Sequence, residues 1–153
     1  MTNSNKRSYY RVSLQVPLSG FLKIIGVNEQ KIESKSAVIL ILDLGAGGMR
    51  IHAKYNFPVS PNLLLEFQFR LFHTDYKILG TIVRKSQYSD SIYEYGIIFS
   101  TGETARQALL HHLNMLHLKL RQVPTLSSCS FSNEEELESF YSNSSSGSTP
   151  AST

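Results

Sequence analysis

Alternating hydrophobic and polar residues in some segments, and short apolar runs in others, predict six β-strands. The clearest is LLLEFQFRLF at residues 63–72, where Leu or Phe at positions 65, 67, 69 and 71 alternates with polar residues. In GMRIHAKY, residues 48–55, the hydrophobic residues share one face and the intervening basic residues share the other. The four remaining predicted strands are residues 9–27, which Pro17 should bend or place at an edge, 36–42, 76–88 and 91–100.

After the last strand the hydrophobic period changes to that of a helix. In residues 101–122 the leucines at 109, 113, 116 and 120 follow the spacing i, i+4, i+7, i+11, which places them on one stripe. Thr101 or Thr104 supplies a capping residue at its start. We therefore expect a mainly β fold: a six-stranded antiparallel β-barrel with one C-terminal α-helix that covers an open end or edge of the barrel.

The C-terminal part has a different composition. Residues 124–153 contain eleven serines and few large apolar residues, so they bury too little apolar surface to offset the entropy of ordering. A short acidic helical turn in FSNEEELESFY, acting as a docking peptide, is the alternative. The expected organisation is a flexible basic N-terminal arm at 1–10, the barrel with its helix at 11–122, and a disordered Ser-rich acidic tail at 123–153.

Charge is distributed unevenly along the chain. All 15 Lys and Arg but only 8 of the 12 acidic residues lie within residues 1–122, which gives this part a net charge of +7. Such a body favours an anionic partner, namely a nucleotide, a nucleic acid, a membrane surface or an acidic protein, unless the charge serves solubility alone. The single cysteine, Cys129, suits a reducing cytoplasm, and no apolar run reaches the roughly 20 residues that span a bilayer. We therefore expect a cytoplasmic protein without membrane insertion.

Nothing in the sequence resembles an enzyme active site. His111 and His112 are adjacent, so on a helix they point in different directions and cannot chelate one metal ion. His52 and His73 are isolated, and we expect them at the surface. The sequence also has no nucleophile elbow, P-loop or dinucleotide-binding fingerprint. These observations predict no catalysis, no metal and no cofactor.

Two short stretches together suggest a binding site. KRSYYR at residues 6–11 holds three cations, with Arg7 and Arg11 four residues apart. DLGAGGMRI at 43–51 is a tight glycine-rich loop between strands, where glycines allow positive φ and exposed N–H groups can form an anion-binding nest. An arginine fork matches phosphate oxygens or the O6 and N7 acceptors of guanine, and the carboxylate of Asp43 accepts from the guanine N1–H and N2–H donors. Alternatively, Asp43 bonds its own turn and the loop is structural.

These residues resemble the PilZ domain family, whose pattern is R-x-x-x-R followed by [D/N]-x-S-x-x-G. Arg7-x-x-x-Arg11 and Asp43-x-Gly45-x-x-Gly48 follow this order. YYRVSLQVPLSGFL, GGMRI and YEYGIIFSTGETARQALLHHL are similar to the family's strands and helix, so the likeness covers roughly residues 6–121. The resemblance implies a receptor for cyclic di-GMP, a bacterial second messenger. The ligand-binding residues it implies are Lys6, Arg7, Arg11, Asp43, Gly45 and Gly48.

The sequence departs from the family pattern at one position, because Gly45 replaces the serine. The lost hydroxyl should weaken binding rather than abolish it, by about 0.5–1.5 kcal/mol. Family members bind one ligand or a stacked pair, and Lys6 before the first arginine favours the pair.

On this reading the protein is not an enzyme. It acts on an unidentified effector, in motility or exopolysaccharide control, after the ligand orders its N-terminal arm. One alternative is a degenerate PilZ-like interaction adaptor that binds no nucleotide. Another is a small barrel for single-stranded nucleic acid, which we disfavour because Phe67 and Phe69 share the expected core face and leave no aromatic binding surface. No DNA or RNA partner is therefore expected.

Overall fold

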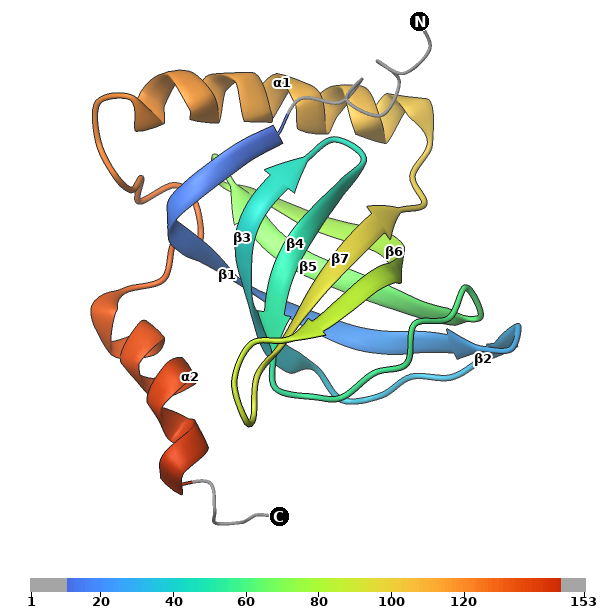
Figure 1. Cartoon of the computed structure of the whole chain (residues 1–153). Coiled ribbons are helices and arrows are strands. Elements are labelled where there is room, and N and C mark those ends of the chain that lie inside the picture. Colours follow the sequence, from blue (N-terminus) through green and yellow to red (C-terminus); the bar gives the residue numbers. More distant parts are fainter. Residues whose placement is uncertain (1–10, 147–153) are drawn as a thin grey trace, which may run out of the picture.

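The computed structural model describes residues 11–146 and shows a closed antiparallel barrel with two helices (Figure 1). The elements are β1 (Arg11–Val27), β2 (Gln30–Lys31), β3 (Ala37–Gly45), β4 (Gly48–Ala53), β5 (Leu63–Leu71), β6 (Thr74–Gln87), β7 (Tyr93–Phe99), α1 (Glu103–Leu120) and α2 (Glu134–Ser146). All six predicted strands are present within a few residues of their expected bounds. The short β2 pairs only with the end of β1.

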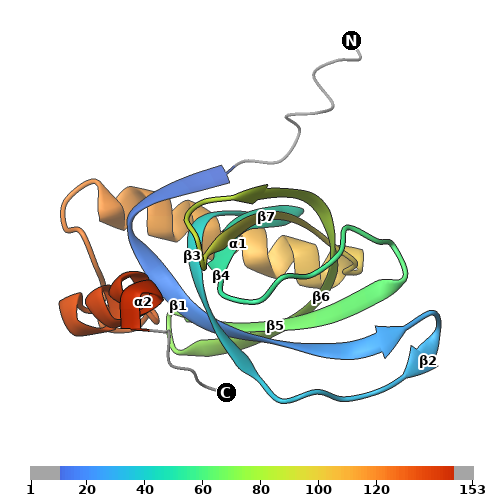
Figure 2. The same cartoon turned by 60° about the horizontal axis from the view of Figure 1, so that its bottom comes forward.

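The barrel closes because β1 is long enough to pair on both sides. The strand order is β2-β1-β3-β4-β7-β6-β5, and β1 also pairs with β5, so the six long strands form a ring (Figure 2). The first half of β1 pairs with β3 and its second half, from Phe21 onward, pairs with β5. The pairing with β3 shifts register between Ser13 and Leu18, which confirms the bend predicted at Pro17. The predicted mainly β fold, a six-stranded antiparallel barrel, is confirmed.

The alternating pattern places one face of each strand in the core. On β5, Leu65, Phe67 and Leu71 have no exposed surface, whereas Arg70 is exposed. Helix α1 lies across one end of the barrel and buries Leu109, Leu113 and Leu116 against it (Figure 1). The helix stripe is therefore confirmed.

The predicted cap of α1 is wrong. The N-cap residue is Gly102, and no side chain caps the helix there. In the first turn Glu103 instead accepts hydrogen bonds from the side chains of Arg106 and Gln107 at 2.8 and 2.9 Å.

The sequence predicts disorder for residues 123–153, but residues 123–146 are ordered in the structure. Beyond the Phe21–Gln68 pair, β1 and β5 no longer hydrogen-bond to each other, and residues 128–132 occupy the gap. Ser130 N–H donates to the carbonyl of Arg70 at 3.0 Å, and Ser19 N–H donates to the carbonyl of Ser130 at 2.7 Å. The serine-rich segment is ordered because its backbone completes the hydrogen bonding between two strand edges.

Helix α2 is stabilised by a capping box and by an apolar stripe. Asn133 Oδ1 accepts from the Glu136 N–H at 2.7 Å, and Glu136 Oε1 accepts from the Asn133 N–H at 2.8 Å. The stripe, led by the buried Phe140, packs on Leu40 and Ile92 on the outside of the barrel. Docking on the barrel is what stabilises α2. The capping box and three apolar side chains alone would not stabilise an isolated helix of this length. Residues 147–153 and the predicted arm at 1–10 lie outside the described residues.

Candidate functional site

Four of the six predicted ligand-binding residues lie together around the ends of β1 and β3. Arg11 opens β1 and is the register partner of Gly45, while Asp43 is the partner of Ser13. Arg11 and Asp43 therefore project from the same side of the sheet. Nη1 of Arg11 forms an ion pair with Oδ1 of Asp43, and 43% of the Arg11 side chain and 14% of the Asp43 side chain remain exposed. The predicted residues Lys6 and Arg7 lie outside the described residues.

Gly48 belongs to the same cluster for a steric reason. A Cβ added to Gly48 would lie 2.2 Å from the carbonyl oxygen of Ile97 on β7 and 3.4 Å from Nη2 of Arg11. The glycine lets the β3–β4 loop lie directly against β7, where the Phe99 N–H donates to the carbonyl of Gly47 at 2.9 Å. No glycine between residues 11 and 146 has positive φ, so this loop does not use the positive-φ conformations that its glycines allow. At Gly48 the glycine is required for close backbone approach.

Asp43 has a second cationic partner that the sequence reasoning missed. Arg50 is its register partner on β4 and donates from Nε to Oδ2 of Asp43 at 2.9 Å. This hydrogen bond raises the pKa of Arg50, with further contributions from the charges of Asp43 and Glu94, against the opposing effect of burial. Each carboxylate oxygen of Asp43 therefore contacts a different arginine.

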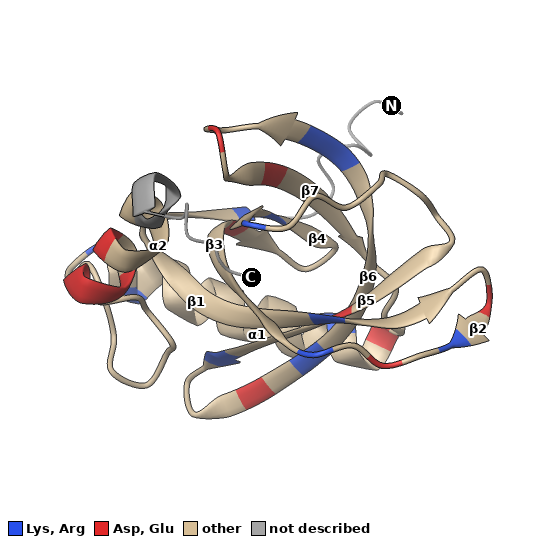
Figure 3. Ribbon diagram, turned by 90° about the horizontal axis from the view of Figure 1, so that it is seen from below, with Lys and Arg blue, Asp and Glu red and all other residues tan. Residues whose placement is uncertain are grey.

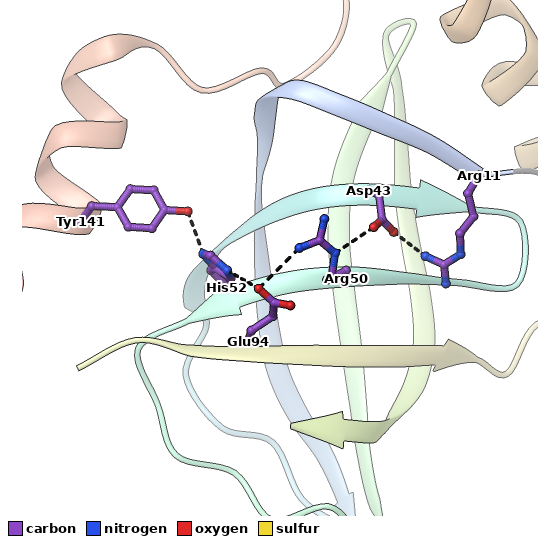
Figure 4. Close-up of polar contacts among 6 residues, drawn as sticks. All are labelled: Arg11, Asp43, Arg50, His52, Glu94 and Tyr141. Atoms are coloured by element: carbon purple, nitrogen blue, oxygen red, sulfur yellow. Dashed lines mark hydrogen bonds and ion pairs between the residues drawn. The ribbon is translucent and has the colours of Figure 1, made fainter. Parts of the chain in front are cut away.

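From Arg50 the polar contacts continue across the sheet to α2 (Figure 4). Arg50 Nη1 lies 3.4 Å from Glu94 Oε1, and His52 Nε2 lies 2.8 Å from the same oxygen. His52 Nδ1 lies 2.8 Å from the hydroxyl of Tyr141. We call the residues Asp43, Arg50, Glu94, His52 and Tyr141 the polar chain.

The protonation states within the polar chain follow from burial. His52 is only 3% exposed, so the surface position expected for it is wrong, and burial lowers its pKa. The neutral ring then donates from Nε2 to Glu94 and accepts at Nδ1 from Tyr141. Burial alone would raise the pKa of Glu94, but the His52 hydrogen bond and the Arg50 charge outweigh it and lower that pKa. Burial, with the nearby Tyr88 and Glu94, raises the pKa of Tyr141 to about 12.

A further cation lies on the same outer face. Arg50 pairs in register with Gly96 on β7, which in turn pairs with Arg84 on β6. The guanidinium of Arg84 lies over Gly96, since its Nη2 and Nε would be 3.0 and 3.1 Å from a Cβ there. Within residues 11–146 Arg84 has no ion-pair partner. Acidic residues, by contrast, cluster on α2, which lies at the side of the molecule (Figure 3).

Comparison with known proteins identifies the family. The PilZ domain model matches residues 5–115, which is most of the chain. The chain belongs to the PilZ domain family. This match spans both motifs on which the resemblance was based. The comparison with curated proteins gives no match.

Solved structures share the fold of this PilZ protein at low sequence identity. YcgR from Escherichia coli in complex with c-di-GMP is 16% identical with a TM-score of 0.53, and MotI/DgrA, the inhibitor of motility from Bacillus subtilis, is 18% identical with a TM-score of 0.53. MrkH from K. pneumonia in its apo state is 15% identical, again with a TM-score of 0.53. The alignments cover 76%, 76% and 74% of this chain and 48%, 53% and 52% of those chains. The PilZ chain therefore spans about half the length of these neighbours.

Two features are absent from the part of the chain that the structure describes. Neither α1 nor α2 has the length and apolar character needed to cross a membrane. Among residues 11–146, no three His, Cys, Asp or Glu side chains are grouped so as to hold a metal ion.

Proposed function

We propose that this PilZ protein is a receptor for cyclic di-GMP. The observation that carries the proposal is the meeting of Arg11 and Asp43 on one outer face beside Gly48, in a chain of the PilZ family. The complex of YcgR with c-di-GMP supports this ligand for the same fold. An arginine fork and a carboxylate together complement a guanine nucleotide, because the first binds phosphate or the Hoogsteen edge and the second accepts from N1–H and N2–H.

Binding exchanges partners at Asp43. In the structure Oδ1 is paired with Arg11 and Oδ2 with Arg50. A guanine edge takes the place of Arg11 at Oδ1, and the released guanidinium turns to a phosphate or to guanine. Arg50 stays on Oδ2 and keeps the carboxylate oriented. The exchange costs little, since an ion pair with a half-exposed partner contributes at most about 1 kcal/mol.

The remaining family positions take the roles that the resemblance implies. Lys6 and Arg7 add charge and a second arginine fork from the N-terminal arm, which becomes ordered over the ligand. Gly45 faces the same side as Asp43, because it lies two residues further along β3 in an unbroken register. A serine hydroxyl there would point toward the ligand, so its absence weakens binding by about 0.5–1.5 kcal/mol without removing the site.

We further propose that the protein acts as an adaptor in the cytoplasm and not as an enzyme. Ligand, ordered arm and barrel wall together form a surface that an effector protein recognises. The motility inhibitor among the structural neighbours supports motility as one setting for such an effector, and exopolysaccharide synthesis is the other.

One observation favours a second candidate function. Gly45 stands where the family has serine, and Arg11 and Asp43 already satisfy each other. A protein-interaction adaptor that binds no nucleotide would show both features. Isothermal titration calorimetry of the folded full-length chain with cyclic di-GMP decides between the two. Saturable binding below high micromolar ligand supports the receptor, and no binding at that concentration supports the adaptor.

A further inference from the structure

The polar chain connects two parts of the molecule that lie far apart in the sequence. Asp43 is at the end of β3, next to the glycine loop, whereas Tyr141 belongs to α2 on the outside of the barrel (Figure 4). Between them each link is a hydrogen bond or ion pair of 2.8 to 3.4 Å. α2 thus contacts, through side chains, the carboxylate that we place at the centre of the ligand site.

Arg50 links Asp43 to Glu94 in a fixed orientation. Its Nε contacts Asp43 and its Nη1 contacts Glu94, so one rigid guanidinium plane is fixed at both ends. Glu94 is in turn held by His52, which is almost fully buried beneath α2 and bonded to Tyr141. When α2 is docked, Glu94 has a defined position, and Arg50 therefore holds Oδ2 of Asp43 in a defined orientation.

We infer that Arg50, Glu94, His52 and Tyr141 are positioning residues for Asp43, and that docking of α2 and binding of cyclic di-GMP stabilise each other. The inference rests on the proposed function and adds regulation of the same site. Its physical basis is preorganisation: a ligand that needs Asp43 in one orientation binds more tightly when that orientation is already fixed. Reciprocity then requires that the ligand stabilise the docked helix by the same factor.

The coupling gives the tail a role in signalling. Residues of α2 line a surface hollow of about 740 Å³ together with the half-exposed Phe21 and Val38. A change in how firmly α2 is docked therefore changes this hollow, at a distance from the bound ligand.

Tyr141→Phe is the most selective test, because it removes only the hydroxyl that reaches His52. Tyr88→Phe is its matched control: the Tyr88 ring packs on the same imidazole with centroids 4.3 Å apart, but its hydroxyl makes no hydrogen bond to the described residues. Calorimetry of the full-length proteins should show cyclic di-GMP binding weakened about two- to tenfold in Tyr141→Phe and unchanged in Tyr88→Phe.

A double-mutant cycle separates positioning from a merely structural role. Arg50→Lys keeps the positive charge near the ligand, but one ammonium cannot contact both Asp43 and Glu94. In the Arg50→Lys background Tyr141→Phe should therefore have no further effect on affinity. Hydrogen exchange supplies the reciprocal measurement: ligand should slow exchange of the amides at residues 137–142 in the wild type, and this protection should be lost in Tyr141→Phe.

The outcomes distinguish this inference from the proposed function. If the wild type does not bind cyclic di-GMP, the proposed function and the coupling both fail. If the wild type binds but Tyr141→Phe binds equally well, and ligand leaves the exchange of α2 unchanged, the coupling alone is refuted. The coupling would also be refuted if Tyr141→Phe weakened binding equally in the wild type and in Arg50→Lys, because the effect would then not pass through Arg50.

Discussion

Replacing Gly48 with alanine should destabilise the free protein as well as weaken ligand binding. The added Cβ would lie 2.2 Å from the carbonyl oxygen of Ile97, so the backbone of β7 must retreat by about 1 Å to reach an ordinary contact distance. Inserting a methyl into such a packed position costs about 1–3 kcal/mol. The gain from a less flexible unfolded chain offsets only about 0.4–1 kcal/mol of this.

Thermal unfolding followed by circular dichroism measures the effect. We expect the Tm of Gly48→Ala to fall by up to roughly 10 °C, given about 2–4 °C per kcal/mol for a chain of this size. Ligand affinity should fall too, because the backbone shift that relieves the clash with Ile97 moves the chain beside Arg11, whose Nη2 lies next to position 48.

Gly26→Ala serves as the matched control for this substitution. A Cβ there has its nearest contact at 3.4 Å, with the Cβ of Leu64, which is an ordinary van der Waals distance. Its Tm should stay level or rise slightly. If Gly48→Ala and Gly26→Ala had the same Tm, the close approach of the loop to β7 would not be what requires glycine at position 48.

Four further predictions concern Arg11, Gly45, His52 and Phe140. Arg11→Ala should reduce affinity for cyclic di-GMP at least about tenfold while leaving the Tm nearly unchanged, since its ion pair is half-exposed; a large drop in Tm would make Arg11 a structural residue. Gly45→Ser should tighten binding by about three- to tenfold in calorimetry, and weaker binding would show that this position does not face the ligand. Because burial lowers the pKa of His52 from 6.5, the unfolded chain binds more protons than the folded one as pH falls through that value. The Tm should therefore drop between about pH 7.5 and pH 5.5, with a smaller drop in His52→Gln, and an identical pH profile would contradict the assignment. Phe140→Ala should cost about 3 kcal/mol of unfolding free energy, because that side chain is only 4% exposed; a cost near zero would mean that α2 is not docked in solution.

The barrel and α1 were predictable because burial on one face leaves a period in the sequence. On β5 the alternation is unbroken from position 65 to 71, and the leucines of α1 repeat at helical spacing. The two motifs were noticed in the sequence through their resemblance to the family pattern, and the pairing of β1 with β3 brings Arg11 and Asp43 together. Capping was mispredicted because it depends on the backbone around Gly102 and not on the nearest threonine.

The order of residues 123–146 was not predicted because the overall serine-rich composition conceals the few residues that stabilise α2. Asn133 and Glu136 form a capping box that is visible in the sequence as N-x-x-E. Leu137, Phe140 and Tyr141 follow at i, i+3 and i+4, which is a short helical stripe. What the sequence could not show is the surface that receives the stripe, since Leu40 and Ile92 come from distant segments.

The polar chain was missed for a related reason. The pairing of Asp43 with Arg50 depends on a register shift between Ile41 and Asp43, which no local pattern specifies. His52 lies on the polar face of β4, and such a face is expected to meet solvent. It is buried because α2, a segment 82 residues further on at its start, covers that part of the barrel. A side chain that looks exposed within its own strand is thus enclosed by tertiary packing.

The most direct measurement is a crystal structure of the full-length protein soaked or co-crystallised with cyclic di-GMP. The account predicts a guanine edge within hydrogen-bond distance of Oδ1 of Asp43, Arg11 turned onto a phosphate or onto guanine, and Arg50 still bonded to Oδ2. A ligand bound elsewhere on the barrel, or one bound while the Arg11–Asp43 ion pair stays intact, would contradict it.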